Sequence, residues 1–419
     1  MKALINVKIY DYVNLLEHGY ILFDEDIHEV GSMESFPKDQ SFEAVIDGQG
    51  RLLLPGLINF HTHMYSAFAR GYDFQRNPNS FTETLEDIWW RMDGALTQED
   101  CYWSAIAHGR DLIRKGVVGV LDHHASGQIR GSTKAVEEAM QEIGLHGLTC
   151  FEISDRFDVE ASIQENMEMV ERTGGPVGLH ASMTLSSQTL ASIKKSIGDH
   201  PIHIHVSESI DDQIHFLRTP VERLSMAELL NPGSVLAHCV HITEADAKTI
   251  ADHKGIVALN PRSNQNNGVG TFDYALFHRH KLPIVVGTDG LGADIAKSWQ
   301  TVYYLAKADP ASRNLMSLTN IQDHIVKSYK VYQDLTGLSL GRFQSGYRFD
   351  AILIDYDQFT PMDENNAFGH VFFGVFDDLR IRSLWNGGQL LLDQYELLHS
   401  SVIPESVVRS LWKRIEVAK

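Results

Sequence analysis

Residues 52–71, which read LLLPGLINFHTHMYSAFARG, contain the strand that organises the rest of the chain. Apolar residues run through a Pro-Gly pair into a short buried strand that ends in His61-Thr62-His63. Side chains alternate between the two faces of a strand, so His61 and His63 point the same way from its end. Two converging imidazoles are half of a metal site. An isolated HxH pair is also common at ordinary strand ends, so the interpretation depends on what later strands supply.

Seven further apolar runs follow, and each begins near Gly or Pro and ends in polar residues. They alternate with helical stretches, the clearest of which are residues 97–115, 132–143 and 159–172. With the first strand included, the runs are residues 57–63, 116–126, 146–156, 175–182, 201–209, 233–243, 255–264 and 282–290. Eight strands with intervening helices match a (β/α)8 TIM barrel, an α/β fold whose active sites lie at the C-terminal strand ends.

Both ends of the chain are rich in strand-like pieces. The N-terminal pieces are ALINVKIY, HGYILFD and FEAVIDGQGRLLL, and RFDAILIDYD, HVFFGVF and IRSLWNGGQLLL follow a helical stretch at residues 297–337. We expect these pieces to form one small β-sandwich domain built from residues 1–55 and 341–400. The barrel then spans residues 56–340, and residues 401–419 contain a C-terminal amphipathic helix.

Composition and charge restrict the classes of partner. The formal net charge of −19 argues against nucleic acid and anionic membranes, which both need basic surface. The N-terminus lacks the apolar core of a signal peptide, and no run of 18 apolar residues suggests a membrane span. The three cysteines form no CxxC pair, which is typical of a reducing compartment. We expect a cytoplasmic protein that acts on a small neutral or cationic molecule.

Two later strands end in further candidate ligands, His205 in HVSE and Asp289 in GTDG. Three imidazoles and one carboxylate suit a single Zn²⁺ or Fe²⁺ ion with a position left for water. Such an ion makes water nucleophilic near neutral pH, and Asp289 could also take the proton of that water. A simple turn after a strand is the alternative for Asp289, and it loses weight because seven strands lead up to this one.

Other polar residues at strand ends are candidates for proton transfer and substrate contact. Glu208 follows His205 by three residues and could carry a proton to a ring nitrogen and a leaving group. His238 ends the sixth strand and could orient the attacking water, with His241 as its rival further into the loop. His180, in GLHAS, could contact the substrate or be a satisfied polar residue of the barrel.

Together these segments resemble the amidohydrolase superfamily, and in particular its mononuclear deaminase and chlorohydrolase branch. The segments that carry the resemblance are PGLINFHTHMYSAFARG, GLHAS, HVSES, LAHCVHIT and VGTDG. Three more, LDHHAS, LNPRSNQNNGVG and GTDGLGADI, are most similar to the SsnA-like aminohydrolases. The resemblance spans nearly the whole chain and implies the same two-part fold.

The resemblance implies roles for individual residues. One divalent ion, zinc by preference with iron as the alternative, is bound by His61, His63, His205 and Asp289. The implied catalytic residues are Glu208, His238 and Asp289, with Glu208 as proton shuttle. The implied substrate contacts are His180, Arg70 and Trp89, and His123 at the end of the second strand is a further candidate contact. Core packing is an equally good interpretation for one of Trp89 and Trp90.

Three features set this sequence apart from the relatives. Ser182-Met183 stands where relatives commonly have Pro-Tyr, and Gly290-Leu291 stands where many have Ser-Asn. The Asp122-His123-His124 cluster could belong to the substrate pocket, form a second metal site, or be a satisfied polar cluster. Strand four has no lysine that could bridge two metals, which favours one ion.

The sequence therefore predicts a metal-dependent hydrolase of C–N bonds that deaminates an amino-substituted, purine-like heterocycle and releases ammonia. One alternative keeps the site but hydrolyses a ring amide or a halogenated heterocycle. Another is a barrel without catalysis that serves as a binding or assembly protein, which the complete ligand set disfavours. The expected partner is a small heterocycle, and a homodimer is expected by analogy with other enzymes of this fold.

Overall fold

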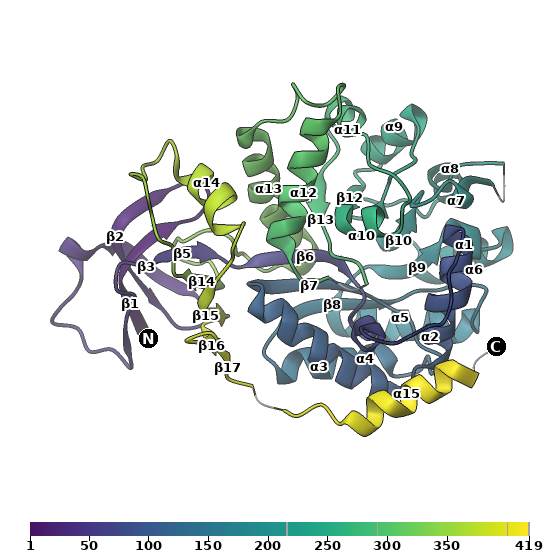
Figure 1. Ribbon diagram of the computed structural model, residues 1–419, viewed down its shortest axis with the longest axis horizontal. Coiled ribbons are helices and arrows are strands. Elements are labelled where there is room, and N and C mark those ends of the chain that lie inside the picture. Colours follow the sequence, from purple (N-terminus) through teal and green to yellow (C-terminus); the bar gives the residue numbers. More distant parts are fainter. Residues whose placement is uncertain (215–216, 291, 400, 418–419) are drawn as a thin grey trace.

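The computed structural model describes residues 1–214, 217–290, 292–399 and 401–417. Figure 1 shows strands from the two ends of the chain lying together at one side, next to a larger body of alternating strands and helices. Leu291 and the last two residues of the predicted C-terminal helix lie outside the described residues.

A strand forms within each of the eight predicted runs. These strands are β6 (Leu57–Thr62), β7 (Val117–His124), β8 (His146–Phe151), β9 (Val177–Ala181), β10 (Ile202–Val206), β11 (Val235–His238), β12 (Ile256–Leu259) and β13 (Ile284–Val286). All pair in parallel, as one set from β6 to β8 and another from β9 to β13. Isolated parallel bridges, Ile153 to Leu179 and Thr62 to Asp289, connect the two sets, so the pairings run in a closed order.

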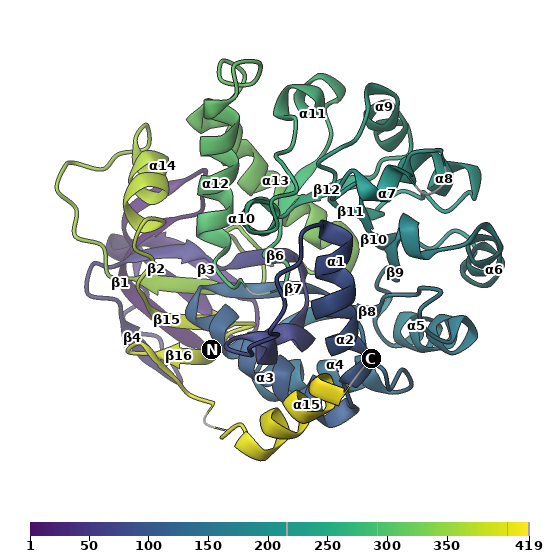
Figure 2. The same cartoon turned by 45° about the vertical axis from the view of Figure 1, so that its right-hand side comes forward.

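The parallel strands are buried on both faces, as their continuous apolar sequences require. Helices cover the outside, as Figure 2 shows. The three predicted helices form as α3 (Gln98–Arg114), α4 (Ser132–Glu142) and α5 (Val159–Thr173). Further helices of this body are α6 (Ser187–Ile197), α7 (Asp211–Ile214), α8 (Pro220–Met226), α9 (Glu244–Asp252), α10 (Pro261–Asn266), α11 (Tyr274–His280), α12 (Ile295–Ala308) and α13 (Leu318–Thr336).

Local sequence fixes where these helices begin and end. Thr97 starts α3 with a capping box, because its hydroxyl accepts from the Asp100 amide while the Asp100 carboxylate accepts from the Thr97 amide. The Asp158 carboxylate caps α5 by accepting from the Ala161 amide, and Gly174 ends this helix at a φ of 70°, where a residue without Cβ is favoured. The helices are thereby aligned with the strand ends that they follow.

Strands from both chain ends form one nine-stranded sheet. Its members are β1 (Lys2–Tyr10), β2 (Leu15–Phe23), β3 (Ile27–Ser32), β4 (Val45–Asp47), β5 (Leu52–Pro55), β14 (Ala351–Ile354), β15 (Ile381–Asn386), β16 (Gln389–Asp393) and β17 (Glu396–Leu397). Antiparallel pairing of β5 with β14 joins the two ends directly before β6. Phe23 and Phe349, with ring centroids 3.8 Å apart, pack across the same junction. The pairings give a single sheet, and its packing as a sandwich stays a prediction.

The segment HVFFGVF was predicted as a strand, and this prediction was wrong. Residues 367–375 are helical instead, as α14 (Ala367–Gly369) and a π-helical turn, His370–Val375. Phe368, Val371, Phe372 and Val375 are all buried, and their spacing of three and four residues puts them on one helical face. Phe373, by contrast, is 47% exposed. The spacing of the buried residues is therefore helical. The three consecutive apolar residues VFF made the segment look like a strand.

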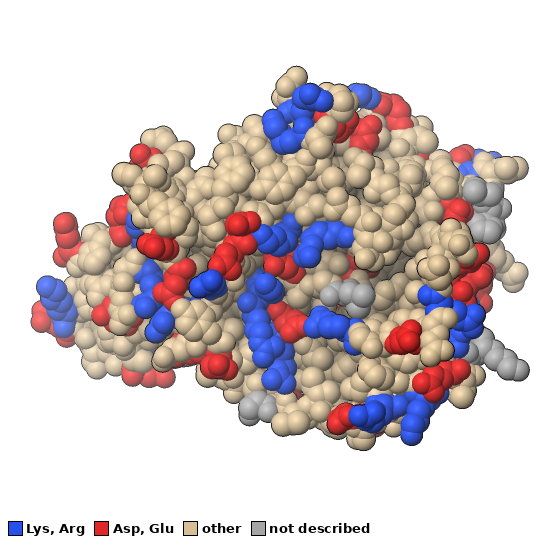
Figure 3. Space-filling model, in the orientation of Figure 1, with Lys and Arg blue, Asp and Glu red and all other residues tan. Residues whose placement is uncertain are grey.

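The C-terminal helix α15 (Glu405–Val417) forms as expected and buries Val407, Leu411 and Ile415. The indole of Trp412 donates to the Phe68 carbonyl at 2.8 Å, which ties α15 to the turn after β6. Among the described residues, no helix has the length and apolarity to cross a bilayer. Figure 3 shows acidic and basic side chains interspersed over one face of the molecule. The absence of nucleic-acid and membrane partners stays a prediction.

Candidate active site

Four predicted ligands meet at the C-terminal ends of the parallel strands. One ligand atom from each of His61, His63, His205 and Asp289 lies within 4.8 Å of the others. Nε2 of His63 is 3.0 Å from Oδ1 of Asp289, and Nε2 of His61 is 3.6 Å from the same oxygen. Strands β6 and β10 and the end of β13 thus bring residues more than 200 positions apart to one point.

Hydrogen bonds at the outer ring nitrogens fix how the three imidazoles face this point. Nδ1 of His63 donates to the His123 carbonyl at 2.6 Å, and Nδ1 of His205 donates to the His180 carbonyl at 2.8 Å. A carbonyl can only accept, so each ring carries a proton on Nδ1, and Nε2 is the nitrogen that presents a lone pair when the ring is neutral. Nε2 of His61 is buried and has no hydrogen-bond partner among the described residues. Inward lone pairs beside a carboxylate fit a divalent cation.

The electrostatics of the four groups agree with that fit. Burial lowers the pKa of His61 to about 3 and the pKa of His205 well below its ordinary value. Burial opposes protonation of His63 as well, but the adjacent Asp289 carboxylate raises the pKa of His63 to about 9. Burial would raise the pKa of Asp289, yet the adjacent imidazoles of His61 and His63 hold that pKa well below its usual range. A cation in this position would replace the proton on His63.

Glu208, which follows β10, and His238, which ends β11, lie beside Asp289. Nε2 of His238 lies 3.4 Å from Oε2 of Glu208 and 3.9 Å from Oδ2 of Asp289. His238 and Asp289 have φ values of 73° and 59°, a left-handed conformation that is strained for such residues and is common at functional sites. The rival His241 contacts the Val269 carbonyl at 2.6 Å, away from these groups.

Helix α10 and its C-terminal cap residue Asn267 orient Asp289, Glu208 and His238, and sequence reasoning missed them. Ser263 donates to Oδ2 of Asp289 at 2.5 Å, and Asn267 donates to Oε1 of Glu208 at 3.2 Å. Nδ1 of His238 lies 2.7 Å from the side-chain oxygen of Asn264. The available signal was the polar run SNQNN directly after the seventh strand.

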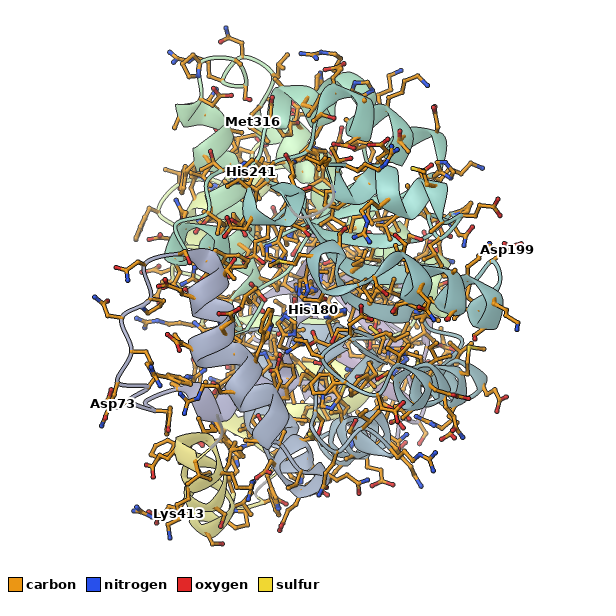
Figure 4. The ribbon with its side chains drawn as sticks, turned by 90° about the vertical axis from the view of Figure 1, so that its right-hand side faces the viewer. Asp73, His180, Asp199, His241, Met316 and Lys413 are labelled. Atoms are coloured by element: carbon orange, nitrogen blue, oxygen red, sulfur yellow. The ribbon has the colours of Figure 1, made fainter. Side chains whose placement is uncertain are left out.

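A cavity of about 360 Å³ opens over these groups. The segment after β6 covers it with α1 (Phe81–Thr84), a π-helical turn (Leu85–Trp89) and α2 (Trp90–Ala95). His180 and Trp89, two predicted substrate contacts, line the cavity together with Trp90 and Met183. Figure 4 shows His180 inside the ring of helices.

Arg70 and His123 do not line this cavity, which corrects two predicted substrate contacts. Arg70 is 59% exposed and pairs with Asp111 at 2.7 Å, because a 3-10 turn, Met64–Ala69, directs the chain outward. His123 is fully buried, and its Nε2 lies 3.0 Å from the Leu179 carbonyl. Its backbone carbonyl is what orients His63. His123 therefore acts on the site through a ligand.

The side chains of Asp122 and His124, the rest of the cluster, are also buried. Oδ1 of Asp122 accepts from the Met64 amide at 2.6 Å, and Oδ2 accepts from the Thr149 hydroxyl at 2.7 Å. Asp122 is therefore a satisfied structural carboxylate. Burial lowers the pKa of His124 to about 3, which keeps that ring neutral.

Comparisons with known proteins agree over most of the chain. A model of the amidohydrolase family matches residues 52–391. A 5-methylthioadenosine/S-adenosylhomocysteine deaminase of Desulfitobacterium hafniense is 28% identical over 95% of this chain and 92% of its own. A 5'-deoxyadenosine deaminase of Methanocaldococcus jannaschii is 24% identical over 95% of this chain and 98% of its own. The solved structure of an adenosine deaminase from Xanthomonas campestris with bound zinc superposes with a TM-score of 0.83 at 17% identity, covering 99% and 98% of the two chains.

Proposed function

Because the chain belongs to the amidohydrolase family, we propose that it is a metal-dependent hydrolase that deaminates an amino-substituted heterocycle and releases ammonia. The observation that carries the proposal is the convergence of three inward imidazole nitrogens on Asp289, with Glu208 and His238 beside it. The names of the curated relatives favour deamination over the halide, ring-amide and non-catalytic alternatives. Adenine-derived nucleosides are therefore the first substrates to test.

His61, His63, His205 and Asp289 would hold one divalent ion. We propose zinc, the ion named in the solved structure of the Xanthomonas campestris deaminase, with iron as the alternative. When bound, the ion supplies Lewis acidity and makes water nucleophilic near neutral pH.

The chain's own residues provide proton transfer. Burial raises the pKa of Glu208 to about 7, so this side chain can hold a proton at neutral pH and deliver it to a ring nitrogen and then to the leaving amine. His238 donates through Nδ1 to Asn264, which leaves Nε2 facing Glu208 and Asp289, where it can orient the attacking water. Asp289 would take the proton of that water.

We propose that residues 56–340 form a (β/α)8 barrel, supported by the closed order of parallel pairings. Residues 1–55 and 341–400 form the small β domain, and α15 is the C-terminal helix. Cytoplasmic location and a homodimer also remain proposals. Gel filtration with light scattering tests the dimer.

Ammonia release from a panel of amino-purines, pterins, pyrimidines and adenine nucleosides tests the function. The zinc-reconstituted protein is expected to release ammonia from at least one ring class. Halide release or ring opening without ammonia would contradict deamination while leaving the metal site intact.

A further inference from the structure

Part of the cavity lining comes from a helical run between β6 and α3. This run consists of α1, the π-helical turn and α2, which follow one another over residues 81–95. Phe81, Leu85 and Trp89 recur at intervals of four residues, and all three line the cavity. Short helices are marginal in water unless they pack against other elements. Because one face of this run borders the open cavity, its position depends on the contacts of its outer face.

Helix α2 has an inner and an outer side. Trp90 and Asp93 are three positions apart and line the cavity. Arg91 and Ala95 are four positions apart and lie on the opposite side of the same helix. The C-terminal helix α15 packs along this outer side and also contacts α3, as Figures 1 and 2 show. The outer side of α2 is therefore held by a helix from the other end of the chain.

The two helices bind each other's C-terminal carbonyl groups. Nη2 of Arg91 donates to the Ile415 carbonyl in the last turn of α15 at 3.0 Å. Nε of Arg414 donates to the carbonyl of Ala95, the last residue of α2, at 2.9 Å. Such carbonyls have no partner within their own helix, and a cation beside them interacts favourably with the helix dipole. Arginine stays charged and can only donate, so the direction of both hydrogen bonds is fixed.

Helix α15 also contacts the chain on both sides of the helical run. The Arg414 guanidinium pairs with the Asp100 carboxylate in the first turn of α3. Before the run, Trp412 donates to the Phe68 carbonyl, and its ring centroid lies 5.5 Å from that of Tyr72. The segment that covers the cavity is thus attached to α15 near its beginning and at its end.

The proposed reacting groups come from other elements. The candidate metal ligands lie on β6 and β10 and after β13, whereas Glu208 follows β10 and His238 ends β11. A displacement of α2 would therefore change a wall that meets the substrate and leave the metal site in place. The loss of contacts that are equally strong in the ground state and the transition state raises KM without lowering kcat.

We propose that Arg91 and Arg414 are positioning residues for substrate binding. By capping each other's helices they fix α2, so that Trp90 and Asp93 keep their places in the cavity wall. The effect on substrate binding rests on the proposed deaminase function. The dependence of residues 81–95 on α15 does not, and it has a separate measurement.

Hydrogen exchange followed by mass spectrometry tests whether the two arginines fix the helical run. In Arg91→Met and Arg414→Met, the amides of residues 81–95 should exchange about tenfold faster than in the wild type, because the run opens locally more often. The amides of the parallel strands should exchange at the wild-type rate. Arg91→Lys keeps a cationic donor and should restore much of the protection. Arg409→Met, which changes an exposed arginine of α15, is the matched control and should behave like the wild type.

Kinetics on the same variants test the link to substrate binding. The probe is the amino-substituted ring that the wild-type protein deaminates fastest. Arg91→Met and Arg414→Met should raise KM for this ring about tenfold and change kcat and zinc content less than about twofold. Arg409→Met should again match the wild type. A purely structural role would instead lower the active fraction, and with it kcat, at unchanged KM.

Wild-type exchange of residues 81–95 in both methionine variants would overturn the inference, and so would faster exchange throughout the protein. A fall in kcat at unchanged KM would overturn it as well. If the wild-type protein releases ammonia from no ring, the proposed function fails, whereas faster exchange confined to residues 81–95 still supports the role of the arginines in fixing α2. If one methionine variant does not fold, the other decides. Failure of both to fold, while Arg409→Met folds, would contradict a role confined to α2.

Discussion

Nδ1 of His61 lies 2.9 Å from Nε2 of His203, and both rings are fully buried. His203 precedes the candidate ligand His205 by two residues, so both side chains lie on the same face of β10. One strand thus supplies a ligand and also the hydrogen-bond acceptor that orients another ligand. The other two imidazoles are oriented by backbone carbonyls, so His61 alone depends on a side chain for this.

Replacing His203 with leucine should weaken zinc binding about 10- to 100-fold, the usual effect of losing the partner that orients a ligand. His203→Gln keeps an acceptor oxygen and should restore much of the affinity. Zinc affinity is measured by competition with a chromophoric chelator, independently of turnover. A leucine variant that binds zinc as tightly as the wild type would show that His203 does not orient His61.

Glu208→Gln should keep zinc and lose turnover by about 10²- to 10⁴-fold, because glutamine cannot deliver a proton. Metal content and ammonia release are measured on the same preparation. Full activity in this variant would rule out Glu208 as the proton shuttle.

Asn267→Leu removes the amide that donates to Glu208 at 3.2 Å. We expect kcat to fall about tenfold with KM and zinc content nearly unchanged, since the change acts on the orientation of the proton donor. Gln265→Leu is the control, because Gln265 is an exposed residue of α10, the helix that Asn267 caps. Equal losses in the two variants would point to a general effect on α10.

His324 should make the fold sensitive to acid. Burial lowers the pKa of His324 to about 4, and the ring contacts the Tyr274 hydroxyl at 3.2 Å. In the unfolded chain this group titrates near 6.5, so the unfolded state gains a proton first as the pH falls. The contribution of the neutral His324 ring to the free energy of unfolding is fully present above pH 6.5. It declines toward pH 4, with about 2 kcal/mol lost at pH 5.

Chemical unfolding at pH 7 and pH 5 tests this effect. His324→Gln should lose less stability between the two pH values than the wild type, by about 2 kcal/mol. His18→Gln, which changes an exposed imidazole, should behave like the wild type. An unchanged pH dependence in the His324 variant would show that this ring is not buried in its neutral form.

The sequence was sufficient for the eight parallel strands, though not for HVFFGVF, and for the meeting of the candidate ligands at the strand ends. Alternation along a strand predicts that His61 and His63 converge, and the barrel rule places His205 and Asp289 at the same end. Arg70 was predicted in the wrong place because a local 3-10 turn sets the direction of the chain there. No hydrophobic periodicity in the sequence indicates such a turn.

The supporting contacts could not be read from local patterns. The ion pairs of Arg156 with Asp93 and Glu152 join the segment after β6 to the segment after β8. Ser263 reaches Asp289 from the loop after a different strand. Such contacts depend on how the loops pack over the strand ends. Hydrophobic periodicity predicts helices and strands but not the packing of loops.

The most direct test is ammonia release by the purified protein before chelation, after removal of its metal, and after addition of zinc. The account predicts one zinc ion per chain, ammonia release that disappears with the metal and returns with zinc, and neither property in Asp289→Ala. Ammonia release that persists without metal, or a zinc-loaded protein that releases none from any amino-substituted ring, would contradict it.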